Sequence, residues 1–218
     1  MVFKDFAFKI GYCFYGIVIG KFYKQLHPDQ FGMKRAIADR SILDKFCTDF
    51  CSVVDRHAKY IIVSGFLAIA SGRTRGTEDI DIIVEKLNKQ KFIGMHNDLV
   101  KRGFICMQSD NPEEIYDNYL SQKASVRYTY KNEPIPEMEL KLAKDELDLY
   151  QIKTRVKIPL TGLEVWFSSI NMNVAFKEEY LKSDKDMEDA RHLRIVYAEQ
   201  ISEDEIKSIK QMIKKLRL

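Results

Sequence analysis

Residues 60–84 constrain the fold of this chain more than any other segment. They contain an apolar run, a Ser-Gly pair, a basic loop flanked by glycines, and a second apolar run with two acids: YIIVSGFLAIASGRTRGTEDIDIIV. This order predicts a buried strand, a turn into a short helix, and a second strand. Because side chains alternate along a strand, Asp79 and Asp81 are expected on one face, with Ile80 and Ile82 in the core. The segment therefore predicts two carboxylates held side by side on a rigid strand.

The turn before these acids has the features of a phosphate site. A helix that begins at Ser64-Gly65 leaves backbone N–H groups free to receive a phosphate, and glycine allows a close approach to the backbone. Arg75 and Thr77 precede the acids and are suited to contact phosphate oxygens or to fix the loop. Two carboxylates opposite such a turn suit a divalent metal that carries a phosphate chain. Taken alone, an Asp-x-Asp pair also fits any half-exposed strand.

Composition places the chain among folded proteins and excludes little else. Of its 218 residues, 45% are hydrophobic and 31% are charged, which is typical of a globular protein and not of a disordered one. The net charge of +3 is too small to indicate a nucleic-acid-binding protein by itself. The four cysteines form no Cys-x-x-Cys pair and have no zinc-site spacing. We interpret them as small buried side chains in a reducing, cytoplasmic compartment.

The first 32 residues are treated as an N-terminal extension of undecided role. Residues 10–20 (IGYCFYGIVIG) are apolar and aromatic, but they are too few to span a bilayer. The segment is compatible with an added helix, a peripheral anchor, or an extension upstream of a natural start at Met33. A membrane-associated protein is an interpretation that rests on this segment alone.

The order of patterns along the rest of the chain predicts an α/β fold with helices at its end. Apolar spacing predicts helices over residues 41–57 and 87–101, the second with Phe92, Leu99 and Val100 buried. Asn111-Pro112 is expected to begin another helix. Strands are expected at 104–107, at 125–130 and 137–142 around a turn at 132–134, and in a hairpin of 156–158 with 163–167. We divide the chain into a core, 33–168, and a C-terminal helical part, 169–218.

The residues of the opening segment resemble a known signature. The run Ser64-Gly65, Gly72, Arg75, Thr77, Asp79 and Asp81 resembles that of the nucleotidyltransferase (polymerase-beta-like) superfamily. More narrowly, it is similar to minimal nucleotidyltransferases related to AbiEii-type toxins, whose motif reads G-G and then G-x-x-R-x-T-x-D-I-D. The chain departs from this motif at Ser64, where the first glycine is expected. The resemblance implies an α/β (α+β) fold, a mixed sheet flanked by helices, and metal binding by the two aspartates.

Such enzymes need a third carboxylate on a neighbouring strand. The candidates are Glu137 and Glu139, which alternation places on one face together with Lys141. We choose Glu139 because it is central in its strand, whereas Glu137 follows a proline. A solvated strand face is the alternative, and the family more often has aspartate at this position.

The region 166–193 resembles the closing motif of the same group, a helix that ends in a lysine followed by K-D-x-x-D. Lys177 and Lys185 are the corresponding lysines. On a helical wheel of ~100° per residue, Asp186 and Asp189 fall inside the apolar stripe. Buried acids are costly unless they are paired, so we expect them to contact Lys177, Lys185 or Arg75. Such contacts either dock the helix on the core or orient a lysine that contacts a phosphate.

The last helix is expected to be mainly structural. Ser202 and Glu205 form a predicted capping box. Four aliphatic residues make its predicted buried side: Ile206, Ile209, Ile213 and Leu216. Its lysines could touch RNA, but such charges more often only solvate a surface.

Together the pattern and the resemblance predict an Mg²⁺- or Mn²⁺-dependent nucleotidyltransferase. It would move a nucleoside monophosphate from a nucleoside triphosphate (NTP) to a hydroxyl, either an RNA 3′ end (tRNA, as the resemblance to toxins implies) or a protein side chain. Asp79, Asp81 and Glu139 are the predicted catalytic and metal-binding residues. Seven residues are predicted to bind the nucleotide: Ser64, Gly65, Arg75, Thr77, Lys141, Lys177 and Lys185. The alternative is a catalytically silent module that binds a nucleotide or a partner protein, for instance in a toxin–antitoxin pair.

Overall fold

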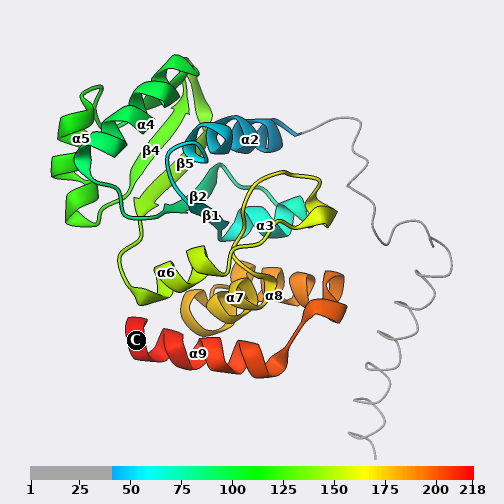
Figure 1. The fold of residues 1–218 in the computed structure, drawn as a ribbon. Helices are drawn as coiled ribbons and strands as arrows, with labels where there is room; N and C mark the ends of the chain where they lie inside the picture. Colours follow the sequence, from blue (N-terminus) through cyan, green and yellow to red (C-terminus); the bar gives the residue numbers. More distant parts are fainter. Residues whose placement is uncertain (1–40) are drawn as a thin grey trace, which may run out of the picture.

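A mixed β-sheet forms one half of the molecule and a group of helices the other (Figure 1). This computed structural model describes residues 41–218, so the extension predicted at 1–32 lies outside the described residues. The described part contains five strands in the order β1-β2-β5-β4-β3. Their bounds are β1 (Tyr60–Val63), β2 (Asp79–Val84), β3 (Phe104–Cys106), β4 (Val126–Tyr130) and β5 (Glu133–Leu142). Strands β2 and β5 are parallel, whereas the other neighbouring pairs are antiparallel.

One face of the sheet is packed by helices. Helix α2 (Ile42–Val54) lies against it with the buried rings of Phe46 and Phe50, which make edge contacts with Phe104 and Tyr128. Helices α4 (Lys89–Lys101) and α5 (Pro112–Asn118) continue this layer, followed by the short turn η2 (Leu120–Gln122). Asn88 and Asn111 cap α4 and α5, the second as predicted. Burial of this face is what gives the sheet its register.

Two details of this layer differ from the prediction. The first helix ends at Val54, and residues 55–57 form a turn. Val100 is 48% exposed, and the buried side of α4 instead consists of Phe92, Met95, His96 and Leu99. At ~100° per residue Val100 points well away from Phe92 and Leu99, so this side chain leaves the apolar stripe.

The opposite face of the sheet is only partly covered. Ile61, Ile83, Ala143 and Ile152 form a small second core there, beneath helix α6 (Glu146–Lys153). Beyond this cluster the face is polar, and it is here that the acids of β2 project. The short helix α3 (Gly65–Ala70) connects β1 to the loop before β2 and packs against the C-terminal helices.

The hairpin of β4 and β5 has its turn earlier than predicted. Strand β5 begins at Glu133, and the reversal is made at Asn132, whose φ is +69°. Pro134 was part of the predicted turn at 132–134, but it belongs to β5, whose pairing with β2 begins only at Glu137. Pro134 and Pro136 therefore lie where β5 extends past β2, and their missing N–H groups cost no hydrogen bond to it.

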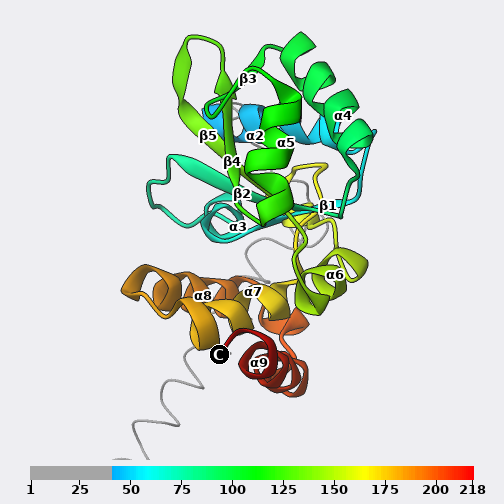
Figure 2. The same cartoon turned by 90° about the vertical axis from the view of Figure 1, so that its left-hand side faces the viewer.

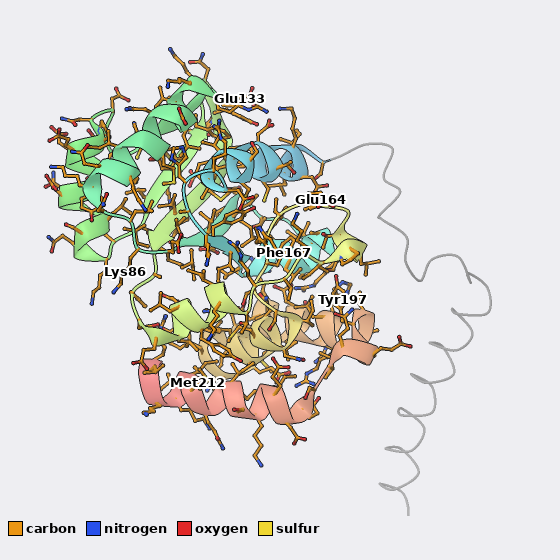
Figure 3. All side chains as sticks on the ribbon, viewed as in Figure 1. Lys86, Glu133, Glu164, Phe167, Tyr197 and Met212 are labelled. Atoms are coloured by element: carbon orange, nitrogen blue, oxygen red, sulfur yellow. The ribbon has the colours of Figure 1, made fainter. Side chains whose placement is uncertain are left out.

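The predicted hairpin of 156–158 with 163–167 is wrong. Val156 and Phe167 make a single bridge, with the turn η3 (Pro159–Thr161) between them. Phe167 also bridges to Ile62, and Ser168 donates its N–H to the Ile62 carbonyl. The segment is thus tied to the free edge of β1, which an isolated hairpin pattern cannot reveal. The buried Phe167 and Tyr197 lie inside the molecule, whereas Glu133 lies at its surface (Figure 3).

The C-terminal region is helical, as predicted. It contains α7 (Ile170–Phe176), the π-turn η4 (Lys177–Leu181), α8 (Asp184–Val196), η5 (Ala198–Gln200) and α9 (Glu203–Arg217). Helices α7, α8 and α9 lie together on one side of the sheet domain in both views (Figure 2). Within residues 41–218 no helix has the length and apolar character needed to cross a membrane.

The start of α9 is capped differently from the prediction. Ser202 accepts the Glu205 N–H at 3.3 Å, which is one half of a capping box. The Glu205 carboxylate instead accepts from Asn171 of α7 at 2.6 Å, and Asn171 accepts the Ser202 N–H at 3.1 Å. A residue of another helix therefore completes the cap. The buried side of α9 agrees with the prediction, except that Leu216 is only half-buried.

Candidate active site

Two pairs of acids lie side by side on the open face of the sheet. The parallel register places Asp79 beside Glu137 and Asp81 beside Glu139. The alternation predicted for β2 is confirmed, because Ile80 and Ile82 are fully buried on the other face. Asp79 is exposed, whereas the Asp81 side chain is 21% exposed. Both candidates for the third acid are thus neighbours of the aspartates, and Glu139 is the one next to the more buried aspartate.

A cation that the sequence analysis did not consider contacts both glutamates. Arg127 of β4 lies opposite Glu139 in the register. Its guanidinium is 3.4 Å from Glu137 Oε2 and 3.5 Å from Glu139 Oε2. The signal was present in the sequence, since Arg127 alternates with the apolar residues Val126 and Tyr128. It could be interpreted only once β4 was known to pair with β5.

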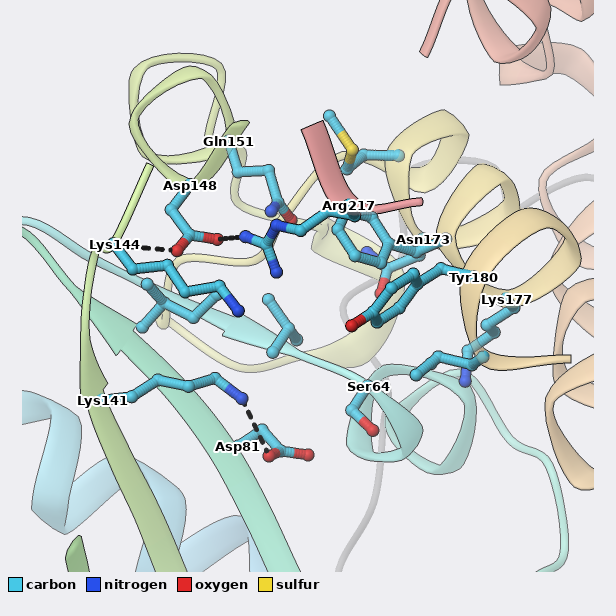
Figure 4. A pocket seen from close by; sticks show the side chains of 15 residues that line it. Ser64, Asp81, Lys141, Lys144, Asp148, Gln151, Asn173, Lys177, Tyr180 and Arg217 are labelled. Carbon is cyan, nitrogen blue, oxygen red and sulfur yellow. Dashed lines mark hydrogen bonds and ion pairs between the residues drawn. The ribbon is translucent and has the colours of Figure 1, made fainter. Parts of the chain in front are cut away.

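A different cation, Lys141, lies beside Asp81. The Lys141 Nζ atom is 3.6 Å from Asp81 Oδ1 (Figure 4). Burial raises the pKa of Asp81, the Lys141 charge acts to lower it, and the charges of Glu139 and Asp79 raise it further. The net effect is a pKa above the ordinary value. A positive charge that comes near this carboxylate therefore stabilises its ionised form.

The turn before α3 keeps the expected shape at a conformational cost. Ser64 has φ 69° and ψ −140°, a combination that favours glycine. A Cβ atom on Gly65 would lie 2.8 Å from Arg75 Nη2, so Gly65 leaves room for the Arg75 guanidinium. Thr77 donates to Asp79 Oδ1 at 2.9 Å and also to the Asp79 carbonyl. Arg75 and Thr77 therefore fix the loop, which was one of the two roles predicted for them.

A buried ion network joins this loop to the C-terminal helices. Asp189 is completely buried and accepts from Lys177 Nζ at 2.8 Å, from Arg75 Nη1 at 2.7 Å, and from Arg73. Asp186 also contacts Lys177, at 3.3 Å. The predicted pairing of these acids with Lys177 and Arg75 is confirmed. Burial lowers the pKa of Lys177, while Asp186 acts to raise it.

Lys185 contributes to this region through its backbone. Its carbonyl accepts from Arg73 Nη1 at 3.1 Å. The Lys185 residue itself is exposed. Arg73 was not singled out in the sequence, although it lies in the same basic loop as Arg75.

A pocket of about 250 Å³ opens beside Asp81 (Figure 4). It brings together four of the residues predicted for the site: Ser64, Asp81, Lys141 and Lys177. Six other predicted residues do not line it: Gly65, Arg75, Thr77, Asp79, Glu139 and Lys185. Its wall also contains residues that were not predicted: Lys144, Asp148, Gln151, Asn173, Tyr180 and Arg217. Aliphatic and aromatic side chains fill the rest of the lining.

The far end of this pocket is built by elements distant in sequence. Asp148 of α6 accepts from Arg217 Nη2 at 2.8 Å and from the Lys144 N–H at 3.0 Å. Arg217 also contacts Asp145, which caps α6. Because α6 and α9 meet only in the folded chain, no local pattern identifies these residues as part of a site.

The donor set at Asp81 suits a hard divalent cation. Proteins hold Mg²⁺ with one or two carboxylates together with substrate phosphates, rather than with a complete protein cage. Among residues 41–218 there is no group of three or more His, Cys, Asp or Glu side chains that could hold a metal ion. The three carboxylates predicted to bind metal, Asp79, Asp81 and Glu139, thus do not form a three-ligand site in this structure. Asp79 and Asp81 alone suit a metal that takes its further oxygens from a nucleotide.

No known family model and no curated protein matches this sequence. Among solved structures, the chain is similar to the solution structure of the antibiotic-resistance factor ANT(2'')-Ia, with a TM-score of 0.51 and 13% identity over 79% of this chain and 91% of that chain.

Two further matches are weaker. A crystal structure of ANT(2'')-Ia in complex with adenylyl-2''-tobramycin has a TM-score of 0.48 and 15% identity over 80% of this chain and 98% of that one. A nucleotidyltransferase-like protein from Paracoccidioides brasiliensis has a TM-score of 0.46 and 15% identity over 79% and 88%. Likeness at such identities concerns the fold. The chain has a nucleotidyltransferase-like α/β fold, a mixed five-stranded sheet flanked by helices.

Proposed function

We propose that the protein is a metal-dependent nucleotidyltransferase that moves a nucleoside monophosphate from an NTP to a hydroxyl acceptor. The observation that carries this proposal is the parallel register of β2 and β5. It sets Asp79 beside Glu137 and Asp81 beside Glu139, and Asp81 lines a pocket that also contains lysines. Carboxylates and lysines in one cleft suit a metal–triphosphate complex, because the carboxylates bind the metal cation and the lysines bind the phosphate oxygens.

Each residue then has a distinct task. Asp79 and Asp81 would hold Mg²⁺ or Mn²⁺, which when bound would polarise the phosphate and favour the alkoxide of the acceptor. Glu139 is the proposed acceptor of the hydroxyl proton. The acceptor oxygen attacks the α-phosphorus, a new phosphoester bond forms, and pyrophosphate leaves. Lys141 neutralises charge on the triphosphate, and the backbone at Ser64 and Gly65 faces it.

The ion network suggests supporting tasks for the other predicted residues. Arg75 and Lys177 both bind Asp189, so we assign them to hold the loop and the C-terminal helices at the cleft. Thr77 would orient Asp79 through its hydrogen bond. Lys185 stays a predicted phosphate contact, one that its exposed position would allow.

The acceptor is proposed to be an RNA 3′ end, such as that of tRNA, or a protein hydroxyl, as the resemblance to AbiEii-type toxins implies. The basic helix α9 gives little support to RNA binding along its length. Lys210 contacts Glu178 at 2.7 Å, Lys214 contacts Glu179 at 3.7 Å, and Arg217 contacts Asp148. These charges are largely neutralised by neighbours within the protein. We expect an RNA acceptor to approach at the pocket instead.

A catalytically silent module that binds a nucleotide or a toxin–antitoxin partner is the second candidate. It is favoured by one observation, namely that Lys141 already pairs with Asp81 and that Arg127 pairs with both candidates for the third acid, Glu137 and Glu139. In such a module these cations would be permanent partners of the acids. In an enzyme they would yield to substrate.

An assay with labelled nucleotides separates the two candidates. The purified protein is incubated with each α-labelled NTP, Mg²⁺ or Mn²⁺, and either total RNA or total protein. We expect label in one of these acceptors, and we expect Asp81→Asn to reduce transfer by at least ~100-fold. Asn has nearly the shape of Asp but removes the charge. Lack of transfer by the wild type with any NTP, together with nucleotide binding that Asp81→Asn leaves unchanged, would sink the enzyme proposal.

The same assay identifies the third acid. Glu139→Gln and Glu137→Gln are matched variants, because both glutamates contact Arg127 and lie two residues apart on one strand face. We expect the first to lose most of the activity and the second to retain most of it. The reverse order would move the proton-accepting task to Glu137.

A further inference from the structure

Lys141 places a positive charge next to the Asp81 carboxylate. It belongs to β5, two residues beyond Glu139 on the same strand face, and is paired in register with Ile83 of β2. The Lys141 side chain is 36% exposed and reaches to 3.6 Å from the Asp81 carboxylate. Lysine and a divalent cation at this position would be mutually exclusive, since both need the same carboxylate oxygens and repel each other.

Two further acids of this face, Glu137 and Glu139, are neutralised in a similar way. Arg127 lies between Glu137 and Glu139, at 3.4 and 3.5 Å from their oxygens. Glu137, Glu139 and Asp81 therefore already have counter-ions in the protein alone, whereas Asp79 has none within residues 41–218. Among the described residues there is also no three-ligand cluster to compensate a metal for the loss of its water.

We infer that Lys141 is an exchangeable counter-ion of Asp81, which keeps the acids of this site weak ligands for a divalent metal until a triphosphate draws the lysine away. This inference rests on the proposed function, and it adds an order of events. Metal and NTP bind cooperatively, because the triphosphate offers Lys141 a second anionic partner and at the same time offers the metal its missing oxygens. Coupling of this kind is reciprocal, so the metal must also strengthen the binding of NTP.

The neighbouring lysine provides a control for general electrostatics. Lys144 lines the same pocket, is exposed, and has no hydrogen bond or ion pair from its Nζ atom within residues 41–218. Lys144→Met changes the net charge of the pocket as Lys141→Met does, but it leaves the cation next to Asp81 in place.

The experiment measures the affinity of Mn²⁺ by isothermal titration calorimetry in the absence of nucleotide. The wild type, Lys141→Met, Lys144→Met and Asp81→Asn are compared at one salt concentration, after circular dichroism has shown that each is folded. We expect Lys141→Met to bind Mn²⁺ roughly tenfold more tightly than the wild type, because a cation close to the ligand has been removed. Lys144→Met is expected to change the affinity less than about twofold.

A second titration includes an NTP analogue whose α–β bridge is a methylene group and cannot be cleaved. The analogue should strengthen Mn²⁺ binding clearly in the wild type and much less in Lys141→Met. An unchanged Mn²⁺ affinity in Lys141→Met, or an equal gain in Lys144→Met, would overturn the counter-ion role.

The result for Asp81→Asn separates this inference from the proposed function. If Asp81→Asn removes Mn²⁺ binding while Lys141→Met has no effect, only the role of Lys141 is wrong. If Asp81→Asn binds Mn²⁺ as the wild type does, the metal site itself is elsewhere, and both proposals fail.

Discussion

Ser64 adopts backbone angles that glycine adopts freely and that serine adopts only under strain. Its φ of 69° and ψ of −140° match the first central position of a type II′ turn, where glycine is usual. The resemblance to nucleotidyltransferases also places a glycine at this position. A strained residue at a turn beside a candidate site is typically held in place by its surroundings. Here those surroundings are the buried strand β1 and the start of α3.

Ser64→Gly is therefore expected to stabilise the protein. Relief of strain should contribute ~1–3 kcal/mol, from which the greater freedom of glycine in the unfolded chain subtracts about 0.4–1 kcal/mol. We expect a net increase of about 1 kcal/mol in the free energy of unfolding, measured by urea titration. Ser64→Ala is the matched control, because it also removes the hydroxyl but keeps a Cβ atom at a φ of 69° and therefore keeps the strain. A destabilised Ser64→Gly variant would show that the serine hydroxyl matters more than the strain.

Asp81 makes the stability of the protein depend on pH in a definite direction. Burial holds the pKa of this carboxyl above its usual value. A group with a raised pKa in the folded state stabilises the protein fully at low pH, and this contribution is lost as the pH rises through the folded pKa. Asn has no ionisable carboxyl group, so the Asp81→Asn variant does not lose this contribution as the pH rises. The variant should gain stability relative to the wild type as the pH rises above about 4, the ordinary pKa of an aspartate.

Urea titrations of both proteins across this range provide the measurement. The difference between them is the informative quantity, because it cancels the titration of all other groups. A difference that stays constant with pH would contradict the raised pKa. The same variant is expected to be inactive, so it would also show that this carboxylate is kept at a cost in stability.

At the scale of elements, the sequence predicts local structure well and the meeting of distant segments poorly. The cap of α5, the Ser202 half of the α9 cap and the alternation of β2 follow from neighbouring residues, and they were predicted. The position of β5 beside β2 followed only from the family resemblance, and its parallel direction was not predicted, since nothing local specifies which strand lies beside β2. Arg127 and Arg217 were missed for the same reason, because their partners are distant in the chain.

The two wrong predictions, a turn at Pro134 and a hairpin that includes residues 163–167, also have a common origin. Pro134 was read as part of a turn, although β5 simply extends beyond its neighbour at that point. The apolar residues of 163–167 suggested a hairpin, but they follow the edge of β1. In each case the environment supplied by another element decided the conformation.

The cap of α9 yields a prediction at this scale. Asn171 donates to Glu205 and accepts from the Ser202 N–H, so it satisfies two groups at the start of another helix. We expect Asn171→Ala to lower the free energy of unfolding by about 1–2 kcal/mol. Combination with Glu205→Ala in a double-mutant cycle isolates the contact between the two side chains. Additive effects would mean that this contact contributes nothing.

At the scale of the whole molecule, a single buried acid connects the sheet to the C-terminal helices. Asp189 of α8 binds Arg73 and Arg75 from the loop before β2, and Lys177 from η4. Removal of a buried charge that has several partners leaves those partners unpaired. The network thereby fixes the position of α8 against the loop that carries the candidate site.

Asp189→Ala is expected to lower the free energy of unfolding by roughly 3–5 kcal/mol. Glu188→Ala is the matched control: it is the adjacent residue on the same helix and also contacts Arg73, but its side chain is 60% exposed. We expect this control to cost less than ~1 kcal/mol. Thermal and urea unfolding of both variants provide the comparison, and similar losses in the two would contradict the docking role of Asp189.

The central claim is that this cleft transfers the α-phosphorus of an NTP with its nucleoside. The most direct test compares two forms of the same NTP, one labelled at the α-phosphate and the other at the γ-phosphate, with Mg²⁺ and the acceptor fraction. The account predicts that the α label enters the acceptor, that the γ label is released as pyrophosphate, and that Asp81→Asn abolishes both events. Entry of the γ label into the acceptor would contradict it, because the cleft would then transfer a phosphoryl group instead of a nucleotidyl group.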